Sequence, residues 1–130
     1  MANLETVQAA YAAFARNDPS VLFGAMDPAI RWHQAEGNPL ADRSPYCDPQ
    51  AIGDGVFGRL LAAIDNFTVV PHTYIDGGDH IVVLGRYGGV MKKSGAKLDA
   101  PFCHVFHFAA GRIASFQQYT DTAQWTRLMG

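Results

Sequence analysis

The chain has 130 residues, a formal net charge of −2, 48 % hydrophobic residues and 17 % charged residues. This length suits a single domain over residues 1–130, and this composition is globular, so a core can form without disulfides or bound metal. Because the charge is slightly negative and the basic residues are scattered, nucleic acid is excluded as an expected partner.

The sequence also shows no signal-peptide pattern and no membrane-spanning stretch. The first residues lack a basic start followed by an apolar run, and no apolar stretch reaches the roughly 20 residues of a spanning helix. Cys47 and Cys103 are far apart and match no metal-ligand spacing. We therefore expect a cytoplasmic protein with reduced thiols, no membrane partner, no metal site and no cofactor.

The N-terminal half is predicted to contain three helices and one strand. Asn3 is a plausible N-cap for a helix whose apolar face is Leu4, Val7, Tyr11 and Phe14. Asp18-Pro19 and Asp48-Pro49 are pairs typical of helix starts, and the third helix carries the apolar residues Ile52, Val56, Phe57, Leu60, Leu61 and Ile64. Between the second and third helices, residues 29–34 form a strand and residues 35–49 form a Gly- and Pro-rich loop.

The C-terminal half is predicted to be a meander of four strands followed by a short helix. The strands cover residues 67–75, 80–92, 97–108 and 112–120, and the segments DGGD, KSGA and AAG between them are typical of hairpin turns. The helix covers residues 122–129. The order α-α-β-α-β-β-β-β-α defines an α+β fold with helices on one face of a curved sheet.

The last hairpin places two polar residues on an aromatic face. A three-residue loop at residues 109–111 would pair Phe108 with Arg112 and His104 with Phe116. Side chains alternate along each strand, so one face would carry Phe102, His104, Phe106, Phe108, Phe116, Gln118 and Thr120. The other face would carry Cys103, Val105, His107, Ile113, Ser115, Gln117 and Tyr119. Because buried polar groups need partners, His104 and Gln118 should each have a hydrogen-bond partner or face a cavity.

Several segments together resemble one known family. HVFHFAAGRIASFQQYTDT resembles the C-terminal hairpin of SnoaL-like proteins, and DPQAIGDGVFGRLL, YIDGGDHIVVLGRYGG and SGAKLDAPFCHVF resemble the middle of the same proteins. That family belongs to the nuclear transport factor 2-like superfamily, with ketosteroid isomerases and polyketide cyclases. The resemblance implies a cone-shaped, antiparallel or mixed sheet wrapped around the N-terminal helices, and a homodimer formed through the outer sheet face.

The resemblance also implies candidate catalytic positions. The general-base aspartate of ketosteroid isomerases aligns with His33, and their protonated oxyanion aspartate aligns with His104. Their oxyanion tyrosine aligns with Ala10, which has Tyr11 beside it, so the chain departs from the isomerase pattern at all three positions. The acid/base aspartate of the polyketide cyclases corresponds to Asp121.

Each catalytic candidate has a structural alternative. His104 can donate to a ligand carbonyl or shuttle a proton, or it can be a core residue satisfied by a backbone carbonyl or Gln118. Either His33 or its neighbour Trp32 faces the pocket, because side chains of consecutive strand residues point to opposite faces. Asp121 can be an acid/base group or the N-cap of the last helix. In the loop, Asn38 and Glu36 are expected to be solvated.

We therefore expect a conical pocket for a hydrophobic small molecule. Its predicted lining is Tyr11, Phe14, Trp32, Phe57, Phe102, Phe106, Phe116 and Gln118. The first hypothesis is an isomerase- or cyclase-type enzyme that transfers a proton next to a carbonyl of a ring substrate. The alternatives are a non-catalytic protein that binds such a ligand, and an interaction module that uses the outer sheet face.

Overall fold

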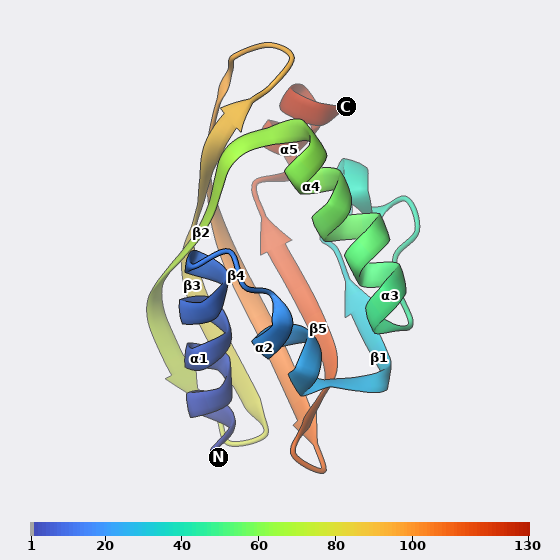
Figure 1. Ribbon diagram of the computed structural model, residues 1–130, viewed down its shortest axis with the longest axis vertical. Helices are drawn as coiled ribbons and strands as arrows, with labels where there is room; N and C mark the ends of the chain where they lie inside the picture. Colours follow the sequence, from blue (N-terminus) through green and yellow to red (C-terminus); the bar gives the residue numbers. More distant parts are fainter. Residues whose placement is uncertain (1) are drawn as a thin grey trace.

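The computed structural model describes residues 2–130 and confirms the expected α+β order (Figure 1). The helices are α1 (Asn3–Ala15), α2 (Ser20–Ala25), α3 (Pro49–Ile52), α4 (Gly58–Ala63) and α5 (Thr122–Met129). A 3-10 turn, Pro39–Ala41, lies in the long loop, and a π-helical turn, Gly53–Phe57, joins α3 to α4. The strands are β1 (Met26–His33), β2 (Ile64–Asp76), β3 (His80–Met91), β4 (Lys97–Ala109) and β5 (Arg112–Thr120). Within residues 2–130, no helix has the length and apolar character needed to span a membrane.

The five strands form one mixed sheet in the order β1-β5-β4-β3-β2. Strand β1 runs parallel to β5, and the other neighbouring pairs are antiparallel. Figure 1 shows that the sheet curves around α1, α2 and the α3–α4 segment, which all lie on its concave side. This arrangement is the cone that the resemblance to SnoaL-like proteins implied, and it puts one sheet face against the core.

Of the two aspartates predicted as N-caps, only Asp48 is one, because α2 begins at Ser20 and has Pro19 at the N-cap position. Asp18 accepts a hydrogen bond from the backbone N–H of Ser20 at 3.0 Å, and Asp48 accepts one from Ala51 at 2.7 Å. The predicted cap at Asn3 is wrong, because α1 already includes Asn3, whose side-chain amide donates to the Gly78 carbonyl at 3.0 Å.

The helical segment after Asp48 differs from its prediction at the C-terminal end. Leu61 was assigned to the apolar face but is 55 % exposed, and Ile64 begins β2 instead of closing the helix. The π-helical turn changes the helical phase between α3 and α4, which a regular 3.6-residue period does not anticipate. Gly55 lies in that turn against the Tyr46 ring, where a Cβ atom would collide with the ring.

The β4–β5 hairpin has a two-residue turn where the sequence suggested three residues. Ala110 and Gly111 both have positive φ, at 52° and 77°, as in the tight turns of twisted hairpins. This turn alone would move the pairing by one residue, and the register shift between His107 and Phe108 moves it by one more, so His104 pairs with Gln118, two residues away from the predicted partner Phe116. A shift of two residues preserves the face of each side chain, so the aromatic face is as predicted.

One residue of the hairpin lies on the face opposite to its prediction. Ile113 was assigned to the mixed outer face but is fully buried. The β4–β5 register shifts between His107 and Phe108, and this bulge reverses the alternation near the turn. The strands also leave large apolar side chains exposed, namely Val70, Ile75, Leu84, Val90 and Tyr119. A homodimer through the outer face stays a prediction.

Candidate functional site

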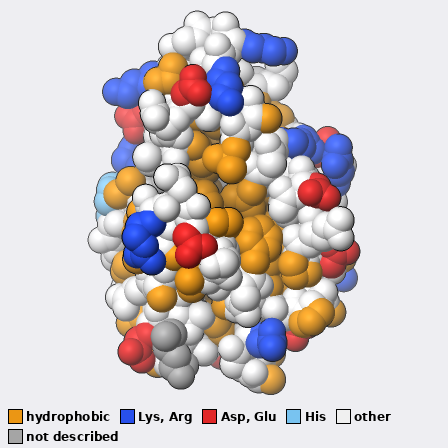
Figure 2. Space-filling model, in the orientation of Figure 1, with side chains coloured by type: hydrophobic (Ala, Val, Ile, Leu, Met, Phe, Trp, Pro, Cys, Tyr) orange, Lys and Arg blue, Asp and Glu red, His pale blue; other side chains and the backbone are white. Residues whose placement is uncertain are grey.

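A cavity lies between the concave face of the sheet and the helices. Its volume is about 60 Å³ with the side chains as they stand. Figure 2 shows hydrophobic side chains gathered in the hollow between the helices, on the face that Figure 1 also presents. The lining is mostly apolar and comprises Ala10, Tyr11, Phe14, Leu22, Trp32, Gln34, Val56, Phe57, Leu60, Phe67, Val69, Tyr87, His104, Phe106, Phe116 and Gln118.

All predicted lining residues except Phe102 border this cavity. Phe102 is buried beside His104 on β4, and its ring stacks on the imidazole with ring centroids 3.9 Å apart and planes at 12°. It therefore supports His104 from the side and does not line the cavity. The correction follows from the tight pairing of β3 and β4, where the Phe102 ring packs against the backbone at Gly85.

His104 is a buried, neutral imidazole with a hydrogen-bond partner on each ring nitrogen. Its Nδ1 lies 2.6 Å from the hydroxyl of Tyr11 on α1, and its Nε2 lies 2.6 Å from the hydroxyl of Tyr87 on β3. Desolvation by burial lowers the pKa of His104 to about 3. The side chain therefore remains uncharged at neutral pH, where one nitrogen donates a hydrogen bond and the other accepts one.

Gln118 extends this pair of hydrogen bonds into a longer hydrogen-bonded series. The backbone N–H of Ala35 donates to Gln118 Oε1 at 3.2 Å, and because a backbone amide is always a donor, this contact orients the side-chain amide. Asn38 also donates to Oε1, at 3.1 Å, and its own orientation is set by the Leu40 N–H, which donates to Asn38 Oδ1 at 2.8 Å. Gln118 Nε2 is therefore the group that donates to the Tyr87 hydroxyl, at 2.8 Å.

This series of hydrogen bonds leaves one hydroxyl proton over. One amide proton of Gln118, the hydroxyl protons of Tyr87 and Tyr11 and the ring N–H proton of His104 make four donors in series, but only three contacts join these groups. If each group accepts from its predecessor and donates to the next, Gln118 donates to Tyr87, Tyr87 to His104 Nε2, and His104 Nδ1–H to Tyr11. The hydroxyl proton left over then belongs to Tyr11, which lines the cavity.

Both tyrosine hydroxyls are donors rather than bases. Burial raises the pKa of Tyr11 well above its ordinary value, and the nearby Tyr87 and Tyr74 raise it further. Burial likewise raises the pKa of Tyr87, although the hydrogen bond from Gln118 opposes this shift. Both groups therefore remain protonated across the physiological range. No aspartate or glutamate is among the lining residues, so the cavity has no carboxylate base.

The structure does not bring His33 into this cavity. Trp32 is the inward residue of the pair, 3 % exposed, and it stacks on Phe116 with ring centroids 3.7 Å apart. His33 points the other way and is half-buried in a separate outer cleft, which it shares with Glu36 and Tyr119. The alternative in which Trp32 faces the pocket is therefore the observed one.

Asp121 is also outside the cavity. Its carboxylate accepts hydrogen bonds from the backbone N–H of Gln124 at 3.2 Å and from the Gln124 side-chain amide at 3.3 Å. Asp121 is exposed and is the N-cap of α5. This is the structural alternative considered for the residue, and it separates Asp121 from His104.

Two residues of this hydrogen-bonded series, Tyr87 and Asn38, were not predicted to belong to the site. Tyr87 lies on the same face of β3 as the buried Ile81 and Val83, so alternation along the strand could have placed it inward. Asn38 was expected to be solvated but is 5 % exposed, because its loop folds over Gln118. No local signal marks Asn38, since its partner is 80 residues away in the sequence.

The comparisons with known proteins agree with this geometry. The family model for the SnoaL-like domain matches residues 7–116, and the chain belongs to this family. The solved structures that resemble it include nuclear transport factor 2-like proteins. No curated protein matches the sequence.

Three solved structures illustrate the similarity. A nuclear transport factor 2-like protein from Burkholderia thailandensis is 32 % identical, with a TM-score of 0.93, 100 % of this chain covered and 98 % of the other. A nuclear transport factor 2-like protein of unknown function from Burkholderia pseudomallei is 28 % identical, with a TM-score of 0.86 and coverages of 98 % and 96 %. TerC, co-crystallized with polyporic acid, is 22 % identical, with a TM-score of 0.83 and coverages of 97 % and 96 %. At that identity, the likeness to TerC concerns the fold alone.

Proposed function

We propose that this protein binds a hydrophobic small molecule carrying a carbonyl or similar acceptor oxygen, with the Tyr11 hydroxyl as its hydrogen-bond donor. The observation that carries the proposal is the neutral His104, held between Tyr11 and Tyr87 at the wall of an apolar cavity. A donor without an acceptor in a dry pocket is costly, so a ligand oxygen that accepts its proton gains affinity.

The apolar lining favours a ligand that is mostly hydrocarbon. The cavity is smaller than the roughly 150 Å³ of an engineered apolar cavity that binds benzene. A ring ligand therefore requires side chains at the helix side to move. Phe14 and Phe57 suit this role. Both line the cavity, both are only partly buried, and their ring centroids are 5.6 Å apart.

Enolisation is a second candidate, and it has one specific observation in its favour. A hydroxyl donor supported by a neutral imidazole can stabilise the oxyanion that forms when a proton is removed next to a carbonyl. The reaction also needs a base within reach of that proton. Neither His33 nor Asp121 lines the cavity, so the residues in place support binding better than proton abstraction.

The test compares 1-indanone with its parent hydrocarbon indane, which lacks the carbonyl oxygen. Binding is followed by amide chemical shifts in the full-length chain. We expect 1-indanone to bind more tightly than indane, and Tyr11→Phe to abolish this preference. Tyr119→Phe is the matched control, because Tyr119 is an exposed tyrosine on the outer face of the same sheet. It should bind both compounds as the unmodified chain does.

The same samples separate binding from enolisation. In D₂O, an enolising enzyme exchanges the α-protons of 1-indanone faster than buffer does, and NMR measures this exchange directly. We expect no acceleration. Acceleration that depends on Tyr11 and His104 would establish the enzymatic alternative. Absence of saturable binding, or a preference for the ketone that survives Tyr11→Phe, would refute the proposed role of Tyr11.

A further inference from the structure

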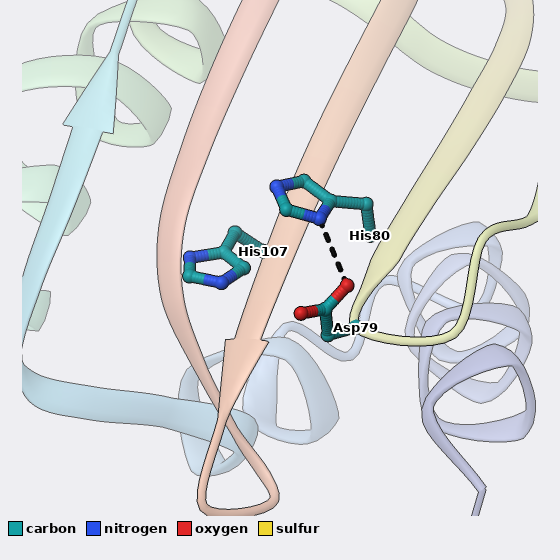
Figure 3. A group of neighbouring side chains, drawn as sticks. All are labelled: Asp79, His80 and His107. Carbon is teal, nitrogen blue, oxygen red and sulfur yellow. Dashed lines mark hydrogen bonds and ion pairs between the residues drawn. The ribbon is translucent and has the colours of Figure 1, made fainter.

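A second group of polar side chains lies away from the cavity, at the turn between β2 and β3. Figure 3 shows Asp79 and His80 joined by a hydrogen bond, with the ring of His107, from β4, beside them. His80 is directly paired with His107 across the β3–β4 ladder, and their rings stack with centroids 4.5 Å apart. The donor atoms of the three side chains all lie within 4.8 Å of one another.

The backbone that carries this group is fixed by hydrogen bonds on several sides. The Phe108 N–H donates to the Asp79 carbonyl at 2.7 Å, and the Gly77 N–H donates to the His80 carbonyl at 2.8 Å. Asn3 of α1 donates to the carbonyl of Gly78 at 3.0 Å, which ties the turn to the first helix. Only side-chain rotations are therefore needed to bring the donor atoms together.

One pair of donor atoms already has the spacing of two ligands on one metal ion. The Nδ1 of His80 lies 3.0 Å from Oδ1 of Asp79. Ligands bound at about 2.1 Å in tetrahedral or octahedral positions are about 3.0 to 3.4 Å apart. A metal ion would replace the proton that these two atoms share, and His107 would approach as the third ligand.

The charge of the group is suited to a cation. Asp79 supplies the carboxylate of the group, and an aspartate side chain has an unperturbed pKa of about 3.9. The carboxylate is therefore ionised at neutral pH. Unprotonated imidazole nitrogens and an ionised carboxylate are the forms that bind metal.

We propose that Asp79, His80 and His107 form a binding site for one divalent transition-metal ion of the Zn²⁺, Co²⁺ or Ni²⁺ kind. Two imidazoles and one carboxylate favour these ions over Mg²⁺ and Ca²⁺, which prefer all-oxygen ligand sets. The side chains of His80 and Asp79 are 54 % and 67 % exposed, so water completes the coordination. No sequence motif predicts this site, because Asp79 and His107 are brought together only by the pairing of β3 with β4.

The test is calorimetric titration of the full-length chain, free of any histidine tag, with ZnCl₂ and separately with MgCl₂. We expect one Zn²⁺ per chain and no comparable Mg²⁺ binding. His80→Ala and His107→Ala should each weaken Zn²⁺ binding at least tenfold, because changes even to the outer partners of metal ligands often cost 10- to 100-fold. Circular dichroism of each variant establishes that it is folded.

Two matched controls make the result specific. His72→Ala removes another exposed histidine, and Cys47→Ser removes an exposed thiol that can itself bind Zn²⁺. Both variants should retain the affinity of the unmodified chain. The proposal is overturned if Zn²⁺ binding is not saturable, if His107→Ala binds as tightly as the unmodified chain, or if Cys47→Ser abolishes binding.

Discussion

The two faces of the β4–β5 hairpin carry histidines in opposite environments. His104 is 6 % exposed and is enclosed by aromatic rings, whereas His107, three residues along the same strand, lies on the outer face beside the exposed His80. Burial removes water from the imidazole of His104 and makes its charged form costly, while the ring of His107 lies on the outer face of the sheet. The same residue type is therefore a fixed neutral hydrogen-bonding group on one face and a potential metal ligand on the other.

The largest expected effect comes from making the same substitution on both faces. His104→Phe keeps an aromatic ring stacked on Phe102 but leaves the Tyr11 and Tyr87 hydroxyls without their imidazole partner. At about 1–3 kcal/mol for each of these two buried hydroxyls, we expect a loss of about 2–6 kcal/mol in the free energy of unfolding, measured by chemical denaturation.

His107→Phe is the control for this comparison. Surface substitutions usually change stability by less than about 0.5 kcal/mol, and we expect the same here. Equal losses for the two variants would contradict the contrast between the faces, as would a His104→Phe variant that is as stable as the unmodified chain.

The second effect is on the pH dependence of stability. The pKa of His104 is about 3 in the folded chain and about 6.5 when unfolded. The unfolded state therefore takes up a proton first as the pH falls below 6.5. The stabilisation is complete above pH 6.5 and declines toward pH 3, with a slope that approaches about 1.4 kcal/mol per pH unit.

Denaturation midpoints measured between pH 7 and pH 5 isolate this contribution. In that window Tyr11 and Tyr87 stay protonated, and the carboxylates with lowered pKa, including Asp42 and Asp79, stay ionised. His104→Phe should flatten the curve, while His107→Phe should retain most of its slope. An unchanged slope in His104→Phe would show that this imidazole is not the group that titrates.

The smallest effect concerns Asp121, which the structure places at a helix end. Asp121→Ala removes the N-cap of α5 and should lower the free energy of unfolding by about 1 kcal/mol. Asp121→Asn keeps a capping oxygen and should lose much less. If Asp121 were an acid/base group, Asp121→Asn would also abolish any α-proton exchange of 1-indanone that the unmodified chain catalyses.

Features of the fold that depend on repeating local patterns were predictable. The alternation of large apolar residues along β4 and β5 predicted the buried face, and a register error of two residues left that prediction intact. The exact partner of His104 was not predictable, because the AAG segment suits both a two-residue and a three-residue turn and because the bulge beside His107 adds a further residue to the shift. Ile113 was assigned wrongly for a related reason, since a bulge is not marked in the alternation.

The candidate site was predicted less completely than the fold. Most of the side chains that line the cavity were predicted, because large aromatic residues on an inward strand face are usually buried. The partners of His104 were not assigned, since Tyr11 is 93 residues away and Tyr87 is 17 residues away on a neighbouring strand. The inward orientation of Trp32 also required the structure, because the sequence allows either Trp32 or His33 to face the core.

The sequence by itself therefore determined the order of the elements, the inward face of the hairpin and the apolar character of the pocket, all of which follow from periodicity and turn chemistry. Only the tertiary structure decided which polar groups meet. Hydrogen bonds and ligand sets depend on positions accurate to a few tenths of an ångström between distant segments. That is why His104 acquires two tyrosine partners inside the cone, and why Asp79 and His107 become neighbours outside it.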